Sequence, residues 1–324
     1  MTGSATPMEP GPGRVQFAFL ASGSRGNAAL VRGEGPGLLI DAGLGPRALG
    51  DRLASVGAGW NAIGAVVLTH THGDHVDSAT FTQMARLGIV VHCHEGHREA
   101  LSGSHGFRSL ENAGLVSCYQ EDRPILTRAG IRIEPIAVSH DGGPTFGFRI
   151  EVSPGRRTRP VALGYLSDSG CWTDRIAESL ADVDAMGIEF NHDEQMQRTS
   201  GRPWVLVRRN LGDRGHLSND QGAELVEAIV RRSRPGSLQH LVLLHLSEQC
   251  NDPSLAIAVA RGAVRGSGRR VAVHAASQDP AHPNLWIRPG RRTARIRPAR
   301  KTGATVSALP SPVLAGLFDE TGAP

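Results

Sequence analysis

Four side chains that can bind a metal ion lie within six residues of this sequence. They are His70, His72, Asp74 and His75, which form the pattern His-x-His-x-Asp-His. Imidazole and carboxylate groups suit zinc and its first-row neighbours. A single loop histidine is usually only solvated, but three at this spacing with an aspartate are typical of a metal site. The pattern therefore predicts a bound ion that could activate a water molecule.

The loop that carries this pattern follows an apolar run, residues 65–68, which we interpret as a buried strand ending at the edge of a sheet. Four later apolar runs also end directly before a polar side chain. These side chains are His140, Asp168, His192 and His245. Strand ends on one edge of a layered sheet converge, so we expect these residues to approach the His70 loop.

Two adjacent metal positions can be built from these side chains. We expect His70, His72 and His140 to form one position. We expect Asp74, His75 and His245 to form the other, with Asp168 bridging the two ions. Taken alone, His140 or His245 would be interpreted as a structural histidine and Asp168 as a turn residue.

The remaining sequence alternates between predicted strands and helices in two halves. Residues 15–20, 28–31, 38–41, 131–138, 145–152, 161–166 and 238–244 favour strands, and residues 46–56, 81–87, 174–180 and 253–264 favour helices. A further helix is expected after Ser218, which begins a capping box with Gln221. The pattern predicts a single layered α/β domain over residues 15–280, after a flexible leader over residues 1–14.

The charge of the chain is concentrated at its end. Residues 281–324 contain seven Arg or Lys against Asp319 and Glu320, which gives this segment +5 and leaves −1 for the rest of a chain whose net charge is +4. We expect the segment to be a disordered basic tail. It could add general attraction to a polyanion, although a run of Arg broken by Pro and Gly is more often a solvated extension.

The four cysteines are scattered without a Cys-x-x-Cys pair, and the chain has no apolar stretch long enough to span a membrane. We therefore expect free thiols in a soluble, cytoplasmic protein with no membrane partner, and leave its oligomeric state open. The Gly-rich loop at residues 22–27 lacks a P-loop ending. The segment 92–97 is not His-Glu-x-x-His, so we interpret it as an ordinary strand end and loop.

Taken in order, these motifs resemble the metallo-β-lactamase-fold hydrolases. The resemblance implies a four-layered αββα sandwich of two mixed sheets flanked by helices. Within that superfamily, the segments 22–27, 41–43, 139–141, 167–170, 191–193, 215–219 and 245–247 resemble the YycJ-like (WalJ) branch, which contains DNA-processing exonucleases and is related to ribonuclease Z. By this resemblance, His192 and His216 would lie in the substrate pocket.

The chemistry expected of such a site is hydrolysis with two divalent ions, Zn²⁺ or alternatively Mn²⁺. Two ions about 3.5–4 Å apart can hold a bridging hydroxide and clamp the oxygens of a phosphodiester. We expect DNA or RNA as the substrate, with Asp74 or Asp168 orienting the water. His216, near the start of a capped helix, is the candidate to contact a phosphate or protonate the leaving oxygen.

Two other functions remain compatible with the sequence. The same ions could hydrolyse a small-molecule ester, thioester or lactone, and only the motifs around His192 and His216 favour a phosphodiester. The protein could also bind nucleic acid without catalysis through structural metals, although structural zinc sites are usually closed tetrahedra. An aromatic content of 4% provides little material for base stacking.

Overall fold

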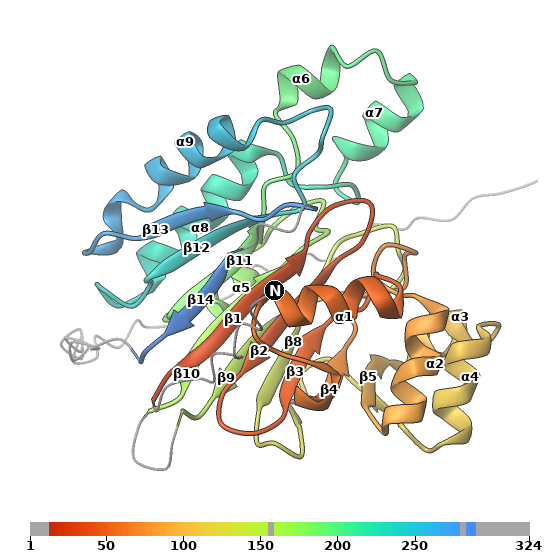
Figure 1. Ribbon diagram of the computed structural model, residues 1–324. Coiled ribbons are helices and arrows are strands. Elements are labelled where there is room, and N and C mark those ends of the chain that lie inside the picture. Colours follow the sequence, from red (N-terminus) through yellow and green to blue (C-terminus); the bar gives the residue numbers. More distant parts are fainter. Residues whose placement is uncertain (1–12, 155–158, 279–282, 290–324) are drawn as a thin grey trace, which may run out of the picture. The chain divides into compact units, whose positions relative to one another are not determined.

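Two seven-stranded mixed sheets form the centre of the protein (Figure 1). The computed structural model describes residues 13–154, 159–278 and 283–289. The strand order of the first sheet is β14-β1-β2-β3-β4-β5-β6, and that of the second is β13-β12-β11-β10-β9-β8-β7. The first sheet contains β1 (Val15–Ala21), β2 (Ala28–Arg32), β3 (Gly37–Ile40), β4 (Ile63–Val67), β5 (Val90–His94), β6 (Val116–Tyr119) and β14 (Asn284–Ile287).

The second sheet repeats the plan of the first, because each has three antiparallel pairings followed by three parallel ones. Its strands are β7 (Ile125–Leu126), β8 (Arg132–Val138), β9 (Thr145–Val152), β10 (Val161–Leu166), β11 (Ala185–Glu189), β12 (His240–Leu244) and β13 (Ala272–Ala275).

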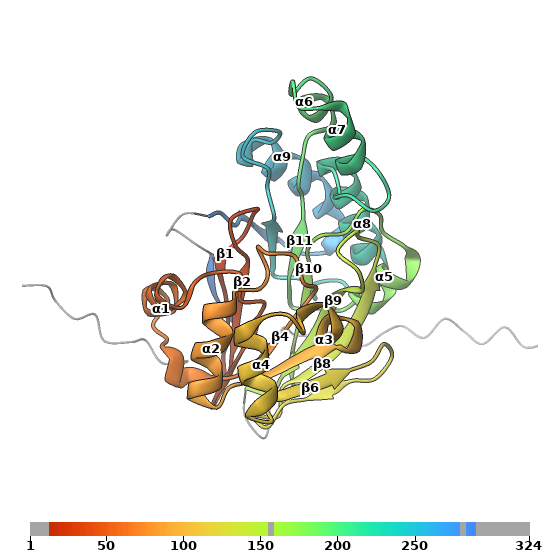
Figure 2. The same ribbon diagram turned by 90° about the vertical axis from the view of Figure 1, so that its right-hand side faces the viewer.

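Helices cover the outer face of each sheet, so that four layers result (Figure 2). The first sheet is covered by α1 (Pro46–Ser55), α2 (Ser78–Leu87), α3 (Glu95–Leu101) and α4 (His105–Asn112). The second is covered by α5 (Asp174–Ser179), α8 (Asn219–Arg232) and α9 (Pro253–Ala263). Two short 3₁₀ helices, η1 (Trp60–Ala62) and η2 (Arg265–Ser267), lie in loops, and α6 (Glu194–Arg198) and α7 (Trp204–Asn210) lie between β11 and α8. The predicted αββα sandwich is confirmed.

The apolar strands are buried on both faces, which explains their unbroken hydrophobic runs. In β1, Phe17 and Phe19 enter the core between the sheets, while Ala18 and Leu20 pack under the helices. Successive side chains of a strand point to opposite faces. One strand therefore contributes to two cores.

One strand of the first sheet lies in the segment that we assigned to the basic tail. Strand β14 pairs antiparallel with β1, and Leu285 and Ile287 are buried between the sheets. The strand is only four residues long, with three apolar residues followed by Arg and Pro, so its pattern is too short to indicate a strand. The tail expected to begin at residue 281 therefore has its first part in the sheet, while residues 290–324 and the leader residues 1–12 lie outside the described residues.

The capping box predicted before α8 is present. The backbone N–H of Gln221 donates to Ser218 Oγ at 3.2 Å, and that of Ser218 donates to Gln221 Oε1 at 2.9 Å. It fixes the start of α8 three residues after His216. Among the described residues, no helix is both long and apolar enough to cross a membrane.

Candidate metal centre

Strand direction brings the predicted ligands of the second sheet to one edge. Strands β8 and β10 both run antiparallel to β9, and β10, β11 and β12 are parallel to one another. The carboxyl ends of β8, β10, β11 and β12 therefore lie at the same edge. His140 follows β8, Asp168 follows β10 and His245 follows β12.

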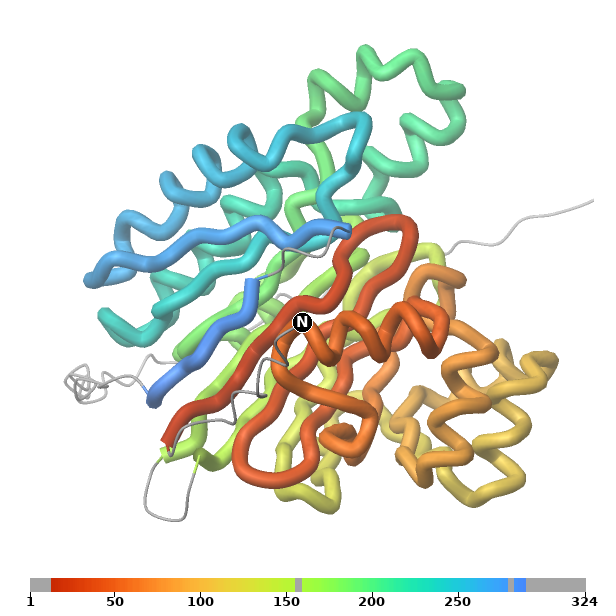
Figure 3. The backbone as a smooth tube through the Cα atoms, viewed as in Figure 1, coloured from red at the N-terminus to blue at the C-terminus, as the bar shows by residue number. Residues whose placement is uncertain are grey.

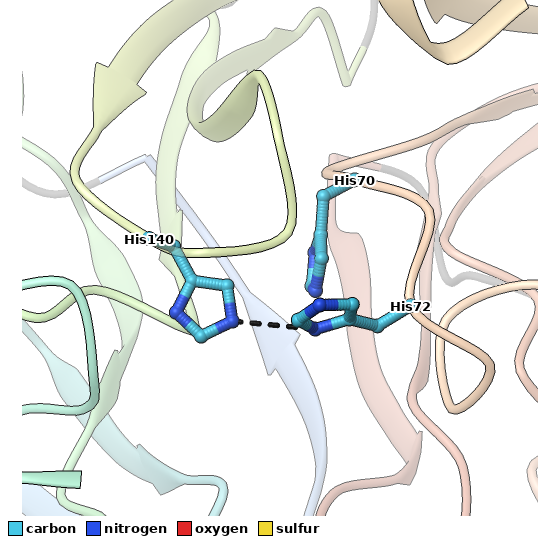
Figure 4. Close-up of side chains that lie close together, drawn as sticks. All are labelled: His70, His72 and His140. Carbon is cyan, nitrogen blue, oxygen red and sulfur yellow. Dashed lines mark hydrogen bonds between the residues drawn. The ribbon is translucent and has the colours of Figure 1, made fainter. Parts of the chain in front are cut away.

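His70, His72 and His140 form an all-imidazole group (Figure 4). Each offers a ring nitrogen within 4.8 Å of the others, and His140 Nε2 lies 3.4 Å from His72 Nδ1. Nε2 of His70 is buried and has no hydrogen-bond partner among the described residues. A buried polar atom without a partner is rare and costly, so this nitrogen fits a metal ligand.

The imidazoles of this group are held in a form that can donate a lone pair. His140 Nδ1 lies 2.9 Å from the carbonyl oxygen of Gly215, which can only accept, so Nδ1 is the donor and Nε2 of the neutral ring carries the free lone pair. Burial lowers the pKa of both His70 and His140. Neutral imidazole is the form that a divalent ion requires.

Asp74, His75 and His245 form a second, mixed group. Asp74 Oδ2 lies 3.6 Å from His75 Nε2 and 3.5 Å from His245 Nε2. On the far side of the ring, His75 Nδ1 lies 2.8 Å from the buried carboxylate of Asp41. Asp41 also accepts hydrogen bonds from the backbone and hydroxyl of Thr69. Such a carboxylate orients an imidazole ligand and raises its basicity.

Asp168 lies between the two groups. Its Oδ2 is 3.1 Å from His75 Nε2 and its Oδ1 is 3.6 Å from His245 Nε2, and it also clusters with His70. Burial opposes ionisation of this carboxyl, but the positive charges of His245 and His75 hold its pKa well below the usual range. A buried carboxylate that reaches both groups fits a bridge between two cations.

Glu189 is a residue of this centre that the sequence analysis missed. It ends β11 and is fully buried, with Oε1 2.8 Å from His216 Nδ1 and 3.4 Å from His245 Nδ1. Although burial opposes ionisation, the charge of His216 and its hydrogen bond lower the pKa of Glu189 to about 2. A signal existed, because a Glu inside an apolar strand needs buried partners.

Of the two histidines expected to contact substrate, only His216 lines a cavity. The cavity has a volume of about 290 Å³, and its lining includes Arg25, Arg202, Arg209, His216 and His245. His192 does not line it: its ring is 1% exposed, and Nδ1 lies 3.2 Å from Asn191 Oδ1. The structure therefore places His216 and Asn191 in the lining of the cavity, while His192 lies in the interior next to Asn191.

Three residues in or next to the centre adopt the left-handed backbone conformation. The φ angles are 59° for Asp41, 57° for Asp168 and 55° for His245. This region is uncommon for residues with a side chain and costs free energy. Asp41 and His245 directly follow a strand and Asp168 comes two residues after the end of β10, so each turn aims the side chain into the centre.

The other histidine-rich segment has a structural role. The His94 side chain accepts a hydrogen bond from the backbone of Gly96 at the start of α3, and His97 Nε2 lies 2.6 Å from the carbonyl oxygen of Pro144. None of the potential metal groups found in the described part of the chain includes a residue of this segment. The expected strand end is present, but a helix follows it rather than a loop.

The sequence matches a protein-family model described as the β-lactamase superfamily domain over residues 37–245. The chain belongs to this family. It is 29% identical over 242 residues to an exodeoxyribonuclease, WalJ, of Streptococcus pneumoniae strain D39, which covers 74% of this chain and 85% of WalJ. It is 24% identical over 259 residues to ribonuclease Z of Streptomyces coelicolor, over 70% of this chain and 82% of the relative.

Among solved structures, the metallo-β-lactamase-fold protein YhfI of Bacillus subtilis has the same fold. The TM-score is 0.58 at 15% identity, over 84% of this chain and all of YhfI. The predicted family resemblance and the hydrolase class are confirmed by these likenesses to members of the β-lactamase superfamily. The seven predicted ligands, the fold and the family together agree with a divalent-metal enzyme.

Proposed function

We propose that the protein is a two-metal phosphodiesterase that cleaves DNA or RNA. The observation that supports this most directly is Asp168, whose two carboxylate oxygens lie near His75 and His245 of the second ligand group and which also clusters with His70 of the first. The similarity to an exodeoxyribonuclease favours DNA, and the similarity to ribonuclease Z makes RNA the alternative. Four free cysteines are compatible with action in the cytoplasm.

The proposed ligands are divided between two positions. His70, His72 and His140 would hold one ion, and Asp74, His75 and His245 the other, with Asp168 shared. The nitrogen and oxygen donors suit Zn²⁺, with Mn²⁺ as the alternative. Two such ions supply an activated water and neutralise the charge that gathers on a phosphodiester during displacement.

Asp74 and Asp168 would also orient the attacking water. Asp74 is partly exposed, with a side-chain exposure of 21%, whereas the Asp168 side chain is 3% exposed. Burial tends to raise the pKa of Asp74, but the hydrogen bond from His245 and the charge of His75 lower it overall. Both groups are therefore ionised carboxylates, which can accept a proton from the attacking water.

His216 is placed to donate a proton to the leaving oxygen. Its Nδ1 lies 2.8 Å from the buried carboxylate of Glu189, which fixes the orientation of the ring. This pairing leaves Nε2 as the nitrogen that can act on a substrate in the cavity. The ring centroid lies 5.1 Å from those of both His140 and His245, so the proposed acid is adjacent to both ligand groups.

The lining of the cavity favours an anionic substrate over a neutral ester. Arg25, Arg202 and Arg209 line it, and Glu248 is its single carboxylate within the described chain. Arg25 pairs with Glu248 and Arg209 with Asp141, whereas Arg202 donates to Gln249 rather than to a carboxylate. Arginine forms directed hydrogen bonds to phosphate oxygens.

The test is a substrate panel with metal-loaded protein, comprising 5′-phosphorylated single-stranded DNA, duplex DNA, structured RNA, bis-(p-nitrophenyl) phosphate and an acyl thioester. We expect cleavage of nucleic acid and of the phosphodiester but little turnover of the thioester. His216→Ala should lower phosphodiester turnover by about 10²–10⁴-fold, the range for a general acid. His105→Ala, at the start of α4, is the control; turnover of the thioester alone would contradict the proposal.

A further inference from the structure

A second hollow, remote from the candidate metal centre, is lined by arginines. It lies at the starts of β12 and β13 and beside the end of α9, with a volume of about 820 Å³. Arg261, Arg265, Arg269 and Arg270 line it, and all four are exposed. Its lining contains no carboxylate among the described residues. Residues 1–280 carry a net charge of only −1, so this is a local concentration of positive charge.

The charge of this arginine hollow is not neutralised by the described protein. None of its four arginines forms an ion pair there, and Arg269 makes only a 3.5 Å contact with the carbonyl oxygen of Gly236. Burial, His274 and Arg269 lower the pKa of His240, another lining residue. Four guanidinium groups at one hollow create a potential that attracts a polyanion.

The arginine hollow and the catalytic cavity lie at opposite ends of one stretch of chain. Val273 lines the hollow, and Gln278 lines the cavity and donates to the carbonyl oxygen of Gly26. Figure 3 shows β13 leading from one end toward the turn between β1 and β2. The five residue steps from Val273 to Gln278 span at most roughly 17 Å. At 3.4 Å per step along one strand of a duplex, this corresponds to about five base pairs.

We propose that the arginine hollow is a second contact for the phosphate backbone of a nucleic acid whose end lies in the catalytic cavity. This inference rests on the proposed nuclease function. Arginine forks match phosphate oxygens, and the contact needs no base recognition. It makes affinity depend on substrate length, because a strand must extend from the catalytic cavity past Val273, a path of about five nucleotides, to reach the arginines.

The experiment compares R265E/R269E with the parent, using metal-loaded protein and fluorescent phosphorothioate duplexes that resist hydrolysis. For a 30-base-pair duplex we expect binding weaker by about tenfold or more at moderate salt, and a slope of log Kd against log salt reduced by about 2. For a four-nucleotide strand we expect no change. Equal affinity of parent and variant for the long duplex would overturn the inference.

The matched control is R86E/R108E on α2 and α4. It has the same charge change, and like Arg269, Arg108 makes a single 3.5 Å contact with a backbone carbonyl. Loss of affinity in the control equal to that of R265E/R269E would mean that net charge, not the hollow, matters. That result would also overturn the inference.

Two further measurements are needed. One distinguishes failure of this inference from failure of the proposed function, and the other distinguishes nucleic acid from an anionic lipid surface as the ligand. Both variants should hydrolyse bis-(p-nitrophenyl) phosphate like the parent. If the parent fails to hydrolyse it, the proposed function fails, while weaker binding by R265E/R269E would still support the hollow as a contact for nucleic acid. If R265E/R269E loses binding to phosphatidylglycerol vesicles but binds the duplex normally, the ligand is a lipid surface and the inference is wrong.

Discussion

The two sheets share one strand plan but contribute to the candidate metal centre in different ways. The first sheet contributes four proposed ligands from the single loop that follows β4. The second contributes His140, Asp168 and His245 from the ends of three strands that are far apart in the sequence. The ligands of the first sheet thus lie together because they are close in the sequence, and those of the second sheet lie together because their strands pair.

The supporting carboxylates follow the same division. Asp41, after β3, contacts the far side of His75, whereas Glu189, at the end of β11, contacts His216 and His245. Asp41 touches only one proposed ligand, but Glu189 touches a proposed ligand and the proposed acid. The comparison predicts that removing Asp41 affects metal affinity alone, whereas removing Glu189 also affects proton transfer.

Asp168→Asn should have the largest effect, because Asp168 contacts both ligand groups. We expect turnover of bis-(p-nitrophenyl) phosphate to fall on the order of 10³-fold or more, beyond the roughly 10–100-fold typical of residues outside the ligand set. Elemental analysis should show less than two ions per chain. Asp174→Asn, on exposed α5, serves as the control. A variant with full metal content and parental turnover would remove Asp168 from the centre.

A comparison of Glu189→Gln with Asp41→Asn tests whether the two carboxylates have different roles, one in metal affinity and the other in proton transfer. We expect Asp41→Asn to weaken metal affinity by about 10–100-fold, with turnover restored by excess metal. We expect Glu189→Gln to lower turnover by a similar factor even at saturating metal, because the carboxylate that holds His216 Nδ1 is lost. Metal titration of turnover distinguishes them. If excess metal rescues both variants equally, the two carboxylates have the same role.

His192→Ala should alter stability rather than substrate binding. The ring is buried and does not line the cavity, so we expect a loss of about 1–3 kcal/mol in the free energy of unfolding and a KM within about twofold of the parent. Chemical denaturation and steady-state kinetics provide the two readouts. An increase of tenfold in KM with unchanged stability would instead place His192 in the substrate pocket.

His97→Gln should have the smallest effect on activity and a measurable effect on acid stability. Burial lowers the pKa of His97 from 6.5 to about 4. Below pH 6.5 the unfolded chain binds a proton that the folded chain does not, so up to about 3 kcal/mol is lost as the pH falls toward 4, and nothing is lost above 6.5.

The variant cannot take up this proton, so its unfolding free energy should fall less steeply between pH 6.5 and 4. Urea denaturation at several pH values measures the slope. Metal content and turnover at neutral pH should stay within about twofold of the parent, since His97 lies outside the groups that could hold an ion. A loss of metal in this variant would instead place the segment 92–97 in the metal centre.

The sequence was sufficient for features that rest on local pattern. The His70 loop, the capping box of α8 and the main apolar strands are local, and the structure contains all of them. The grouping of His140, Asp168 and His245 with that loop was an expectation from strand ends, and the structure brings them together because β8, β10 and β12 run in the same direction.

Features that depend on tertiary contacts were missed. Glu189 belongs to an apolar strand, and only its contacts with His216 and His245 reveal its place in the centre. His192 follows a strand as the ligands do, yet its side chain turns into the interior. Strand β14 is stabilised by pairing with β1 at the opposite end of the chain, and four residues cannot indicate such a partner.

The left-handed backbones of Asp41, Asp168 and His245 have a consequence for the choice of substitution. Alanine at such a position would keep the backbone strain of roughly 1 kcal/mol or more, whereas glycine would relieve it. Either change at Asp41 would also leave the buried backbone N–H of Thr69 without its acceptor. The difference in unfolding free energy between the glycine and alanine variants at one position therefore measures the strain that the fold carries to hold that side chain in the centre.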